Sequence, residues 1–392
     1  MKKNKSNRLI NIIKSLDRPL LFAFLFMLIF GMLNIVTASS REAATWQYGI
    51  YHYFGQHLKM ISLGLVAFFI ALKMPTSKYN RLATIGWIII LGLIIYTIFY
   101  GESHRGSNRW INIEGFRFQP GEFAKPLVIV ITAVLFERYQ KLMIKRPKEA
   151  ESLMRLIFVF GLGLAVAVFF QKDLGNAFII GTIFLSLFIL GPLSAKGKML
   201  YLGLVGLVLL IISTILFWGG GGILEQYQIN RFDFLDPCSK YERRGYQICN
   251  GYIAINEGGL FGVGIGNSRQ KYSYIDEPHT DMVFSIIVEE YGVIIAGGLL
   301  LVYTAIMIRF LAIAKNAKKT RLRYIAFGIF VYTFLQILIN LGGLFGLIPF
   351  TGVILPFLSY GGSFTIAYLA TFGIAFRLCY ENRQEKIKLK KA

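Results

Sequence analysis

Charged residues are scarce in this sequence. Only 16% of the 392 residues are Asp, Glu, Lys or Arg, whereas 55% are hydrophobic and 15% are aromatic. Soluble globular proteins usually carry about 25% charged residues. The composition therefore excludes an ordinary soluble protein and predicts a polytopic membrane protein.

Several motifs are also missing. No set of His and Cys residues has zinc-ligand spacing, and the glycines of 258–266 do not form the Gly-x-Gly-x-x-Gly pattern of a nucleotide site. No internal repeat and no separate soluble domain is evident, so residues 1–392 form one membrane domain. Because no soluble part remains to bind nucleic acid, we attribute the formal charge of +21 to basic loops beside the membrane.

Cysteine is rare as well, with three residues in the chain. Cys238 and Cys249 share one polar loop, and they can form a disulfide if that loop is extracytoplasmic. Two free thiols are the alternative, and the sequence leaves both open. Cys379 lies beside a basic tail and is interpreted as a small apolar side chain.

Long apolar runs dominate what is present. A helix needs about 20 apolar residues to span a bilayer core, and ten such runs predict an all-α membrane protein with ten transmembrane helices. The first run follows the basic stretch Met1–Lys5 but is too long for a cleaved signal, so we expect it to stay attached. The predicted crossings are 19–38, 55–73, 83–100, 122–137, 154–171, 174–192, 199–218, 281–308, 324–347 and 357–378.

The basic residues predict the orientation. Most of the 42 Lys and Arg residues fall in the two tails and in loops 72–82, 136–155, 193–198 and 309–323. Short loops rich in Lys and Arg stay cytoplasmic. Both termini are therefore expected in the cytoplasm, with the basic tail of about 380–392 near anionic lipid, and the long loop of about 219–280 between helices 7 and 8 is expected outside.

That long loop is the main polar interval of the chain. It opens with four glycines, Gly219–Gly222, and later carries the glycine-studded stretch 258–266. Glycine in this stretch predicts a backbone that approaches the membrane or a ligand closely. The loop ends at Asp281, where the chain turns apolar again, so this carboxylate is expected to be half desolvated.

Ionisable groups at the ends of membrane segments are functional candidates. Glu122 and Lys125 share one helix face and form either a structural ion pair or part of a site. Asp173 either caps the sixth helix or joins the site, and Asp281 either caps the eighth helix or acts as a catalytic base. Glu289 and Glu290 follow two turns later, roughly 12 Å along a continuous helix, and His279 is either structural or tunes Asp281.

Five blocks in this sequence resemble the signature blocks of the SEDS family, the RodA and FtsW proteins, and the resemblance covers residues of about 20–380. The run 266–271 is more similar to the division branch, FtsW, than to the elongation branch, RodA. Departures from the family pattern are Gly121 for Ser, Lys172 for Pro, Asp276 for Pro and Met282 for Phe. The blocks are Asn108–Ile111 with Phe118–Lys125, Gln171–Ala177, Pro278–Asp281 with Glu289–Gly292, Gly346–Pro349, and Pro356–Ser363.

The resemblance implies a ten-helix peptidoglycan glycosyltransferase in the cytoplasmic membrane of a bacterium. Such an enzyme polymerises lipid II into glycan strands on the outer leaflet, with inversion, and works with a class B penicillin-binding protein. The essential aspartate of the family falls on Asp281. Glu122 and Asp173 also lie at family motif positions and are candidate substrate-binding residues.

The reaction needs a base for the acceptor hydroxyl and positive charge for the departing diphosphate. Asp281 is the expected base, and the candidate cations are Arg109, Lys125, Arg243, Arg244, Arg269 and Lys271. A divalent cation could supply part of this charge, although no ligand spacing demands one. Two other functions stay open. A lipid II flippase would use deep polar residues, for which Glu289, Glu290, Gln336 and Asn340 are the candidates, and a non-catalytic scaffold would tolerate Asp281→Asn.

Overall fold

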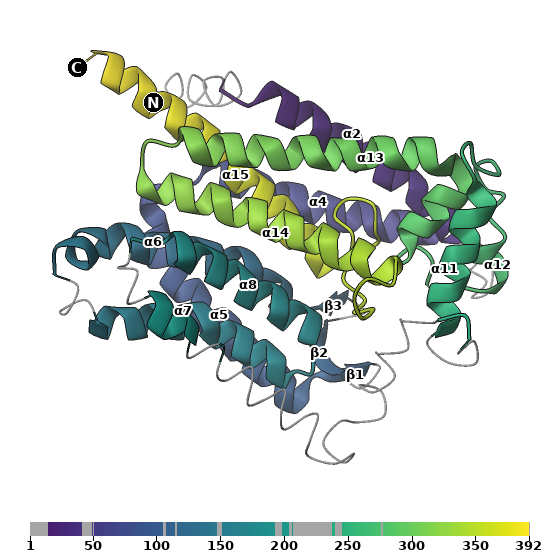
Figure 1. Cartoon of the computed structure of the whole chain (residues 1–392), viewed down its shortest axis with the longest axis horizontal. Helices are drawn as coiled ribbons and strands as arrows, with labels where there is room; N and C mark the ends of the chain where they lie inside the picture. Colours follow the sequence, from purple (N-terminus) through teal and green to yellow (C-terminus); the bar gives the residue numbers. More distant parts are fainter. Residues whose placement is uncertain are drawn as a thin grey trace.

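The computed structural model is a bundle of long helices (Figure 1). It describes residues 15–40, 49, 51–104, 107–113, 116–146, 151–192, 198–203, 206, 237–239, 245–275 and 277–391. Within these ranges, seven helices are long and apolar enough to cross a membrane. They lie at Arg18–Ala38 (α2), His52–Lys73 (α4), Tyr79–Tyr100 (α5, extended by a turn at Thr76–Lys78), Glu151–Phe170 (α7), Val283–Asn316 (α13), Thr320–Leu344 (α14) and Ser363–Lys391 (α15).

Two further helices complete this part of the bundle, Pro120–Lys145 (α6) and Leu174–Leu190 (α8). Nine of the ten predicted crossings therefore coincide with helices in the described ranges. The seventh, 199–218, lies mostly outside them, so the count of ten stays a prediction.

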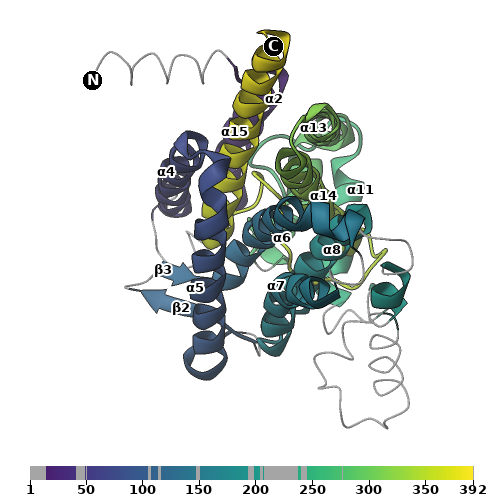
Figure 2. The same ribbon diagram turned by 90° about the vertical axis from the view of Figure 1, so that its left-hand side faces the viewer.

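The helices pack around α6 and α14. α6 contacts α5, α7, α8 and α14, while α14 also packs against α13. On the other side α15 lies along α4, and α13 lies against α2. Figure 2 shows this arrangement from the end of the bundle. In Figure 1 the start of α2 and the end of α15 lie at one end, and α11 and the short strands lie at the other.

A small β-sheet and two short helices at that second end were not predicted. Strands β1 (Glu102–His104), β2 (Ser107–Ile113) and β3 (Phe116–Phe118) form an antiparallel sheet in the order β1-β2-β3. Helix α11 (Gly245–Gly258) packs against α13, and the four-residue helix α12 (Gln270–Ser273) follows it. These elements lie in segments that the sequence placed outside the membrane as loops.

Helix α13 covers the predicted crossing of 281–308 but is interrupted within it. Gly292 has φ 83° and ψ 166°, which is far from helical. Residues 283–291 therefore form a short half-helix, and the long piece begins at Val293. Glycine adopts this backbone without steric cost. Glu289 and Glu290 therefore lie near the end of the half-helix that Asp281 precedes, next to the break at Gly292.

Candidate functional site

The start of α6 is held by the small sheet. Strand β2 carries Arg109, and the Oγ of Ser107 on the same strand donates to the Gln171 carbonyl at 2.7 Å. The backbone N–H of Gln119, which follows β3, donates to the Oγ of Ser363 at 2.8 Å. The sheet therefore fixes α6, the turn before α8 and the start of α15 relative to one another.

A buried polar cluster fills this corner. Lys125 Nζ lies 2.7 Å from Glu122 Oε2, which confirms the predicted pair, and both side chains are buried. Asn176 connects α8 to α6, because its Nδ2 donates to Glu122 Oε1 at 3.1 Å and to Asp173 Oδ2 at 2.9 Å. The Nε2 of Gln119 donates to the same Asp173 oxygen at 2.9 Å. Each charge in the cluster thus has a partner, as burial requires.

Asp173 caps α8, which is one of the two roles that the sequence left open. Its Oδ1 accepts from the Asn176 backbone N–H at 3.2 Å, so it caps α8. Its Oδ2 also lies 3.1 Å from Arg109 NH1, and the Arg109 side chain is 26% exposed. The guanidinium therefore connects the buried cluster to the surface.

Asp281 lies half-buried immediately before the half-helix. The N-cap of α13 is Met282, with no side-chain cap bond, so the alternative that Asp281 caps this helix was wrong. The hydroxyl of Thr280 lies 3.1 Å from Asp281 Oδ1, and the Nδ2 of Asn340 donates to the Asp281 carbonyl at 2.9 Å. Both contacts orient the residue.

The loop between α14 and α15 connects Asp281 with the polar cluster. A methyl group built on Gly352 would lie 3.2 Å from Asp281 Oδ2. One built on Gly175, at the start of α8, would lie 3.1 Å from Val353 Cγ2 and 3.3 Å from Thr351 Cβ. The same three-residue stretch, 351–353, therefore lies against Asp281 and against the helix that Asp173 caps. Gly352 carried no sequence signal beyond its position in a loop.

His279 packs among aromatic rings two residues before Asp281. Its ring centroid lies 4.8 Å from that of Tyr53 and 5.2 Å from that of Tyr360. Burial, with a smaller contribution from nearby His57, lowers the pKa of His279 to about 3. The imidazole is therefore neutral at physiological pH, and its contacts join the Asp281 segment to α4 and to the α14–α15 loop.

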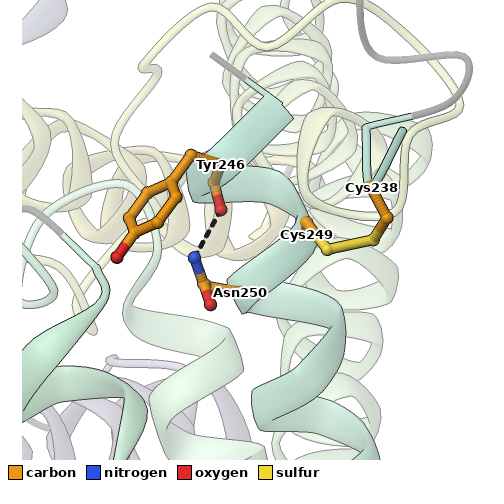
Figure 3. The surroundings of a disulfide bond; sticks show 4 residues. All are labelled: Cys238, Tyr246, Cys249 and Asn250. Atoms are coloured by element: carbon orange, nitrogen blue, oxygen red, sulfur yellow. Dashed lines mark hydrogen bonds between the residues drawn. A yellow bond between two sulfur atoms is a disulfide. The ribbon is translucent and has the colours of Figure 1, made fainter. Parts of the chain in front are cut away.

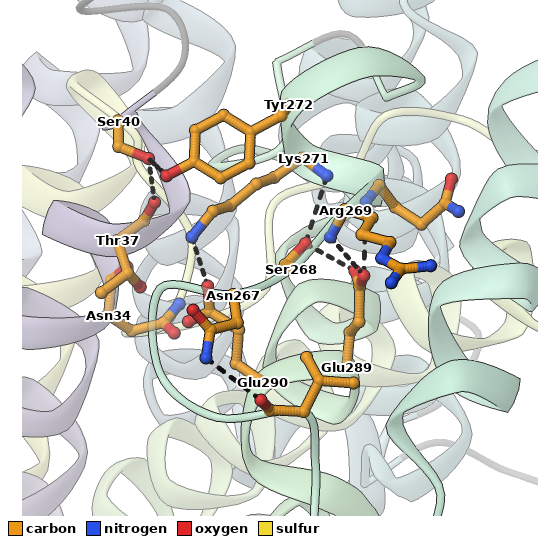
Figure 4. Close-up of polar contacts among 12 residues, drawn as sticks. Asn34, Thr37, Ser40, Asn267, Ser268, Arg269, Lys271, Tyr272, Glu289 and Glu290 are labelled. Atoms are coloured by element: carbon orange, nitrogen blue, oxygen red, sulfur yellow. Dashed lines mark hydrogen bonds and ion pairs between the residues drawn. The ribbon is translucent and has the colours of Figure 1, made fainter.

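A second buried cluster lies at the junction of α13 (Figure 4). Glu289 Oε2 accepts from the Ser268 hydroxyl at 2.5 Å, and Oε1 accepts from the Arg269 N–H at 2.7 Å. Glu290 forms an ion pair with Lys271, and both side chains are fully buried. The two glutamates thus fasten the segment around α12 to the half-helix.

The glycines of 258–266 lie close to another part of the chain. They approach the backbone of α13, since the N–H groups of Val263 and Gly264 donate to the carbonyls of Glu289 and Glu290 at 2.8 and 3.1 Å. A methyl group on Gly262 would lie 2.3 Å from the Glu290 carbonyl oxygen. Only glycine permits this approach.

Cys238 and Cys249 form a disulfide (Figure 3). It ties the turn at 237–239 to α11, whose Asn250 Nδ2 donates to the Tyr246 carbonyl at 2.7 Å. A methyl group on Gly251, in the same helix, would lie 2.6 Å from Met282 Cε. The disulfide therefore fixes a helix that packs against the residue following Asp281.

The candidate cations divide into three groups. Arg109 is partly exposed and Arg269 is exposed. Lys125 and Lys271 are fully buried and paired with glutamates. Arg243 and Arg244 lie outside the described residues. In the described part of the chain no three His, Cys, Asp or Glu side chains are grouped as metal ligands.

Comparison with known proteins agrees with this arrangement. The family model of FtsW, RodA and SpoVE, described as cell cycle protein, matches residues 18–384. The probable peptidoglycan glycosyltransferase FtsW of Bacillus subtilis strain 168 is 31% identical over 385 residues, covering 97% of this chain and 94% of that protein. The protein of the same name from Pseudomonas fluorescens SBW25 is 33% identical over 382 residues, covering 94% and 89%.

Solved structures show the same fold. A chain from a study of structural coordination of polymerization and crosslinking by a peptidoglycan synthase complex matches with a TM-score of 0.72 at 25% identity, covering 94% of this chain and 99% of that one. The rod shape determining protein RodA of Thermus thermophilus matches with a TM-score of 0.65 at 24% identity, covering 94% and 97%. The chain described here therefore belongs to the FtsW, RodA and SpoVE family of cell cycle proteins, the SEDS family.

Proposed function

We propose that this protein polymerises lipid II into peptidoglycan glycan strands at the outer face of the bacterial cytoplasmic membrane. The observation that carries the proposal is the position of Asp281. The residue is half-buried, and its backbone carbonyl accepts from Asn340. Its carboxylate accepts from the Thr280 hydroxyl and lies beside an exposed glycine, Gly352. Family membership supports the same activity, because relatives across nearly the whole chain are named probable peptidoglycan glycosyltransferases.

Asp281 acts as the general base in this proposal. The acceptor sugar hydroxyl gives its proton to the carboxylate while its oxygen forms a bond to the anomeric carbon of the donor. The bond from that carbon to the diphosphate oxygen breaks, and the diphosphate leaves with the electron pair. Attack from the opposite face inverts the anomeric configuration from α to β.

Of the four candidate cations that the structure describes, Arg109 and Arg269 are the proposed ligands of the leaving diphosphate, because their side chains reach the surface. Lys125 and Lys271 are buried against glutamates and support the site through those pairs. Asp173 holds Arg109, and Glu122 connects Lys125 to Asn176. Arg243 and Arg244 stay candidates on the basis of the sequence.

A class B penicillin-binding protein is the proposed partner. One solved relative comes from a peptidoglycan synthase complex that combines polymerization and crosslinking, and such a partner supplies crosslinking that a polymerase lacks. The curated relatives are FtsW proteins, which favours cell division over elongation as the setting.

A lipid II flippase has less support from the geometry. Such a protein needs polar side chains along a path through the bundle. Gln336 Nε2 donates to the Ile354 carbonyl at 3.0 Å, and Asn340 Nδ2 donates to the carbonyls of Asp281 and Val353. Glu289 and Glu290 bind the α12 segment. All four candidates therefore hold local structure.

Purified protein in detergent, given fluorescent lipid II, tests the proposal. The products are separated on a gel, with and without a penicillin-binding protein that lacks polymerase activity, and headgroup transfer across vesicles is followed in parallel. Glycan strands support a polymerase. Transfer without strands would identify a flippase, and neither product, even with the partner, would identify a scaffold.

A further inference from the structure

The glycine-studded segment exposes four apolar side chains. Leu260, Phe261, Val263 and Ile265 are 60%, 81%, 40% and 64% exposed. No residue of Gly258–Gly266 is charged, and we refer to these nine residues as the apolar loop. A continuous exposed apolar group marks a contact with a membrane or with another molecule.

The backbone of the apolar loop is bonded to α13. Val263 and Gly264 donate to carbonyls at the end of the half-helix, and Val293 N donates to the Gly259 carbonyl at 2.9 Å. Ile294 N donates to the Leu260 carbonyl at 3.3 Å. Backbone polar groups that lie against lipid have to be bonded within the protein. These bonds meet that requirement for the groups involved.

The same bonds place the loop beside the first residues of the long piece of α13. There Val293, Ile294 and Ile295 are 45%, 56% and 45% exposed, on a helix long and apolar enough to span a membrane. The exposed apolar surface is therefore continuous from the loop onto this span. A cleft of about 480 Å³, lined by Tyr252, Leu260, Val293 and Phe345 among others, extends it towards α11 and the end of α14.

Polar residues border the loop where a membrane surface would lie. Glu257 before the loop and Arg269 after it are exposed. Tyr272 and Tyr274 follow, with 46% and 41% of their surface exposed. Tyrosine is enriched where a protein crosses from lipid to water. An apolar tip with charged and tyrosine-rich edges matches a lipid interface better than a water-exposed loop.

We propose that the apolar loop inserts into the membrane leaflet on the α11 side of the bundle, where lipid acyl chains surround Phe261 and Ile265. Because its backbone is bonded to the end of the half-helix that Asp281 precedes, the inserted loop holds that half-helix at a fixed height relative to the lipid headgroups. The inference rests on the geometry of the loop and does not depend on the proposed activity.

Spin labelling tests the insertion. In a Cys379→Ser background, with the Cys238–Cys249 disulfide intact, a nitroxide is attached at Phe261→Cys or at Ile265→Cys and the full chain is placed in phosphatidylcholine–phosphatidylglycerol nanodiscs. Collisions with oxygen, which enters lipid, are compared with collisions with a water-soluble nickel chelate. Ile294→Cys gives the lipid reference, and Lys388→Cys, on a residue whose side chain is 74% exposed, gives the water reference.

We expect both loop positions to match Ile294, with a high oxygen-to-nickel collision ratio. A ratio equal to that of Lys388 would overturn the proposal, because the loop would then lie in water. Low collision rates with both reagents would also overturn it, since protein would then cover the loop. Using two positions, and checking that each variant elutes as a single species with its disulfide intact, separates these outcomes from misfolding.

Discussion

Loss of one charge from the Lys271–Glu290 pair is expected to be more harmful than loss of both. The two side chains are 0% exposed, and Glu290 Oε2 has no hydrogen-bond partner among the described residues. Removing one partner of a buried pair leaves an uncompensated charge and costs about 3–5 kcal/mol, whereas replacing both by apolar residues is often nearly neutral. We therefore expect Lys271→Met and Glu290→Met each to destabilise the protein strongly, and the double variant to recover most of the loss.

A double-mutant cycle of unfolding free energies in mixed micelles measures this effect. The expected coupling energy is at least about 2 kcal/mol. The matched control is the Lys319–Glu385 pair, whose atoms are 2.8 Å apart but whose side chains are 51% and 23% exposed, so its coupling should not exceed about 1 kcal/mol. Additive effects at Lys271 and Glu290, or equal coupling in the two pairs, would refute the reasoning.

Three further predictions concern the surroundings of Asp281. Gly352→Ala should lower the polymerisation rate by roughly 10–100-fold, because the new methyl group lies 3.2 Å from Asp281 Oδ2. Replacing Cys238 and Cys249 by Ser should cost about 2–3 kcal/mol of stability, since the disulfide closes a separation of 11 residues. His279, with its pKa lowered to about 3, binds a proton only in the unfolded state between about pH 6.5 and 3. Stability should therefore fall as the pH drops through this window, and less steeply in His279→Asn.

Each of these has its own control. Gly266 has φ 87° and open space at its Cβ position, so Gly266→Ala carries similar backbone strain without the contact, and an equal rate loss in both variants would remove the steric argument. Cys379→Ser removes a free cysteine and keeps the disulfide. If its melting temperature were as low as that of the double serine variant, the loss of stability could not be attributed to the disulfide. Thermal unfolding at pH 7.5 to 4.5 should give different slopes for wild type and His279→Asn; parallel slopes would exclude His279 as the cause.

The helices could be predicted because membrane spans are continuous apolar runs, which a sequence displays directly. The Glu122–Lys125 contact was also predictable, since residues three apart share a helix face. The break at Gly292 was not, because a glycine inside an apolar run is compatible with an intact helix and only its neighbours in space decide. The bond between Arg109 and Asp173 joins a strand to a helix cap, and no local pattern encodes that meeting.

The catalytic assignment of Asp281 was made from a motif, and the structure adds the surroundings that make it testable. Asn340 and Gly352 come from the end of α14 and the loop after it, and the stretch 351–353 also contacts the start of α8. Such convergence depends on how the bundle packs. The sequence contained these residues without indicating that they would lie beside Asp281.

The measurement that tests the central claim most directly is the rate of glycan-strand formation by Asp281→Asn relative to wild type. Both proteins are compared at equal amounts of folded material, as judged by melting temperature and by binding of lipid II. As the amide cannot accept the acceptor proton, we expect a loss of roughly 10²–10⁴-fold with substrate binding preserved. Strand formation by Asp281→Asn within a few-fold of the wild-type rate would contradict the role of Asp281 as the base.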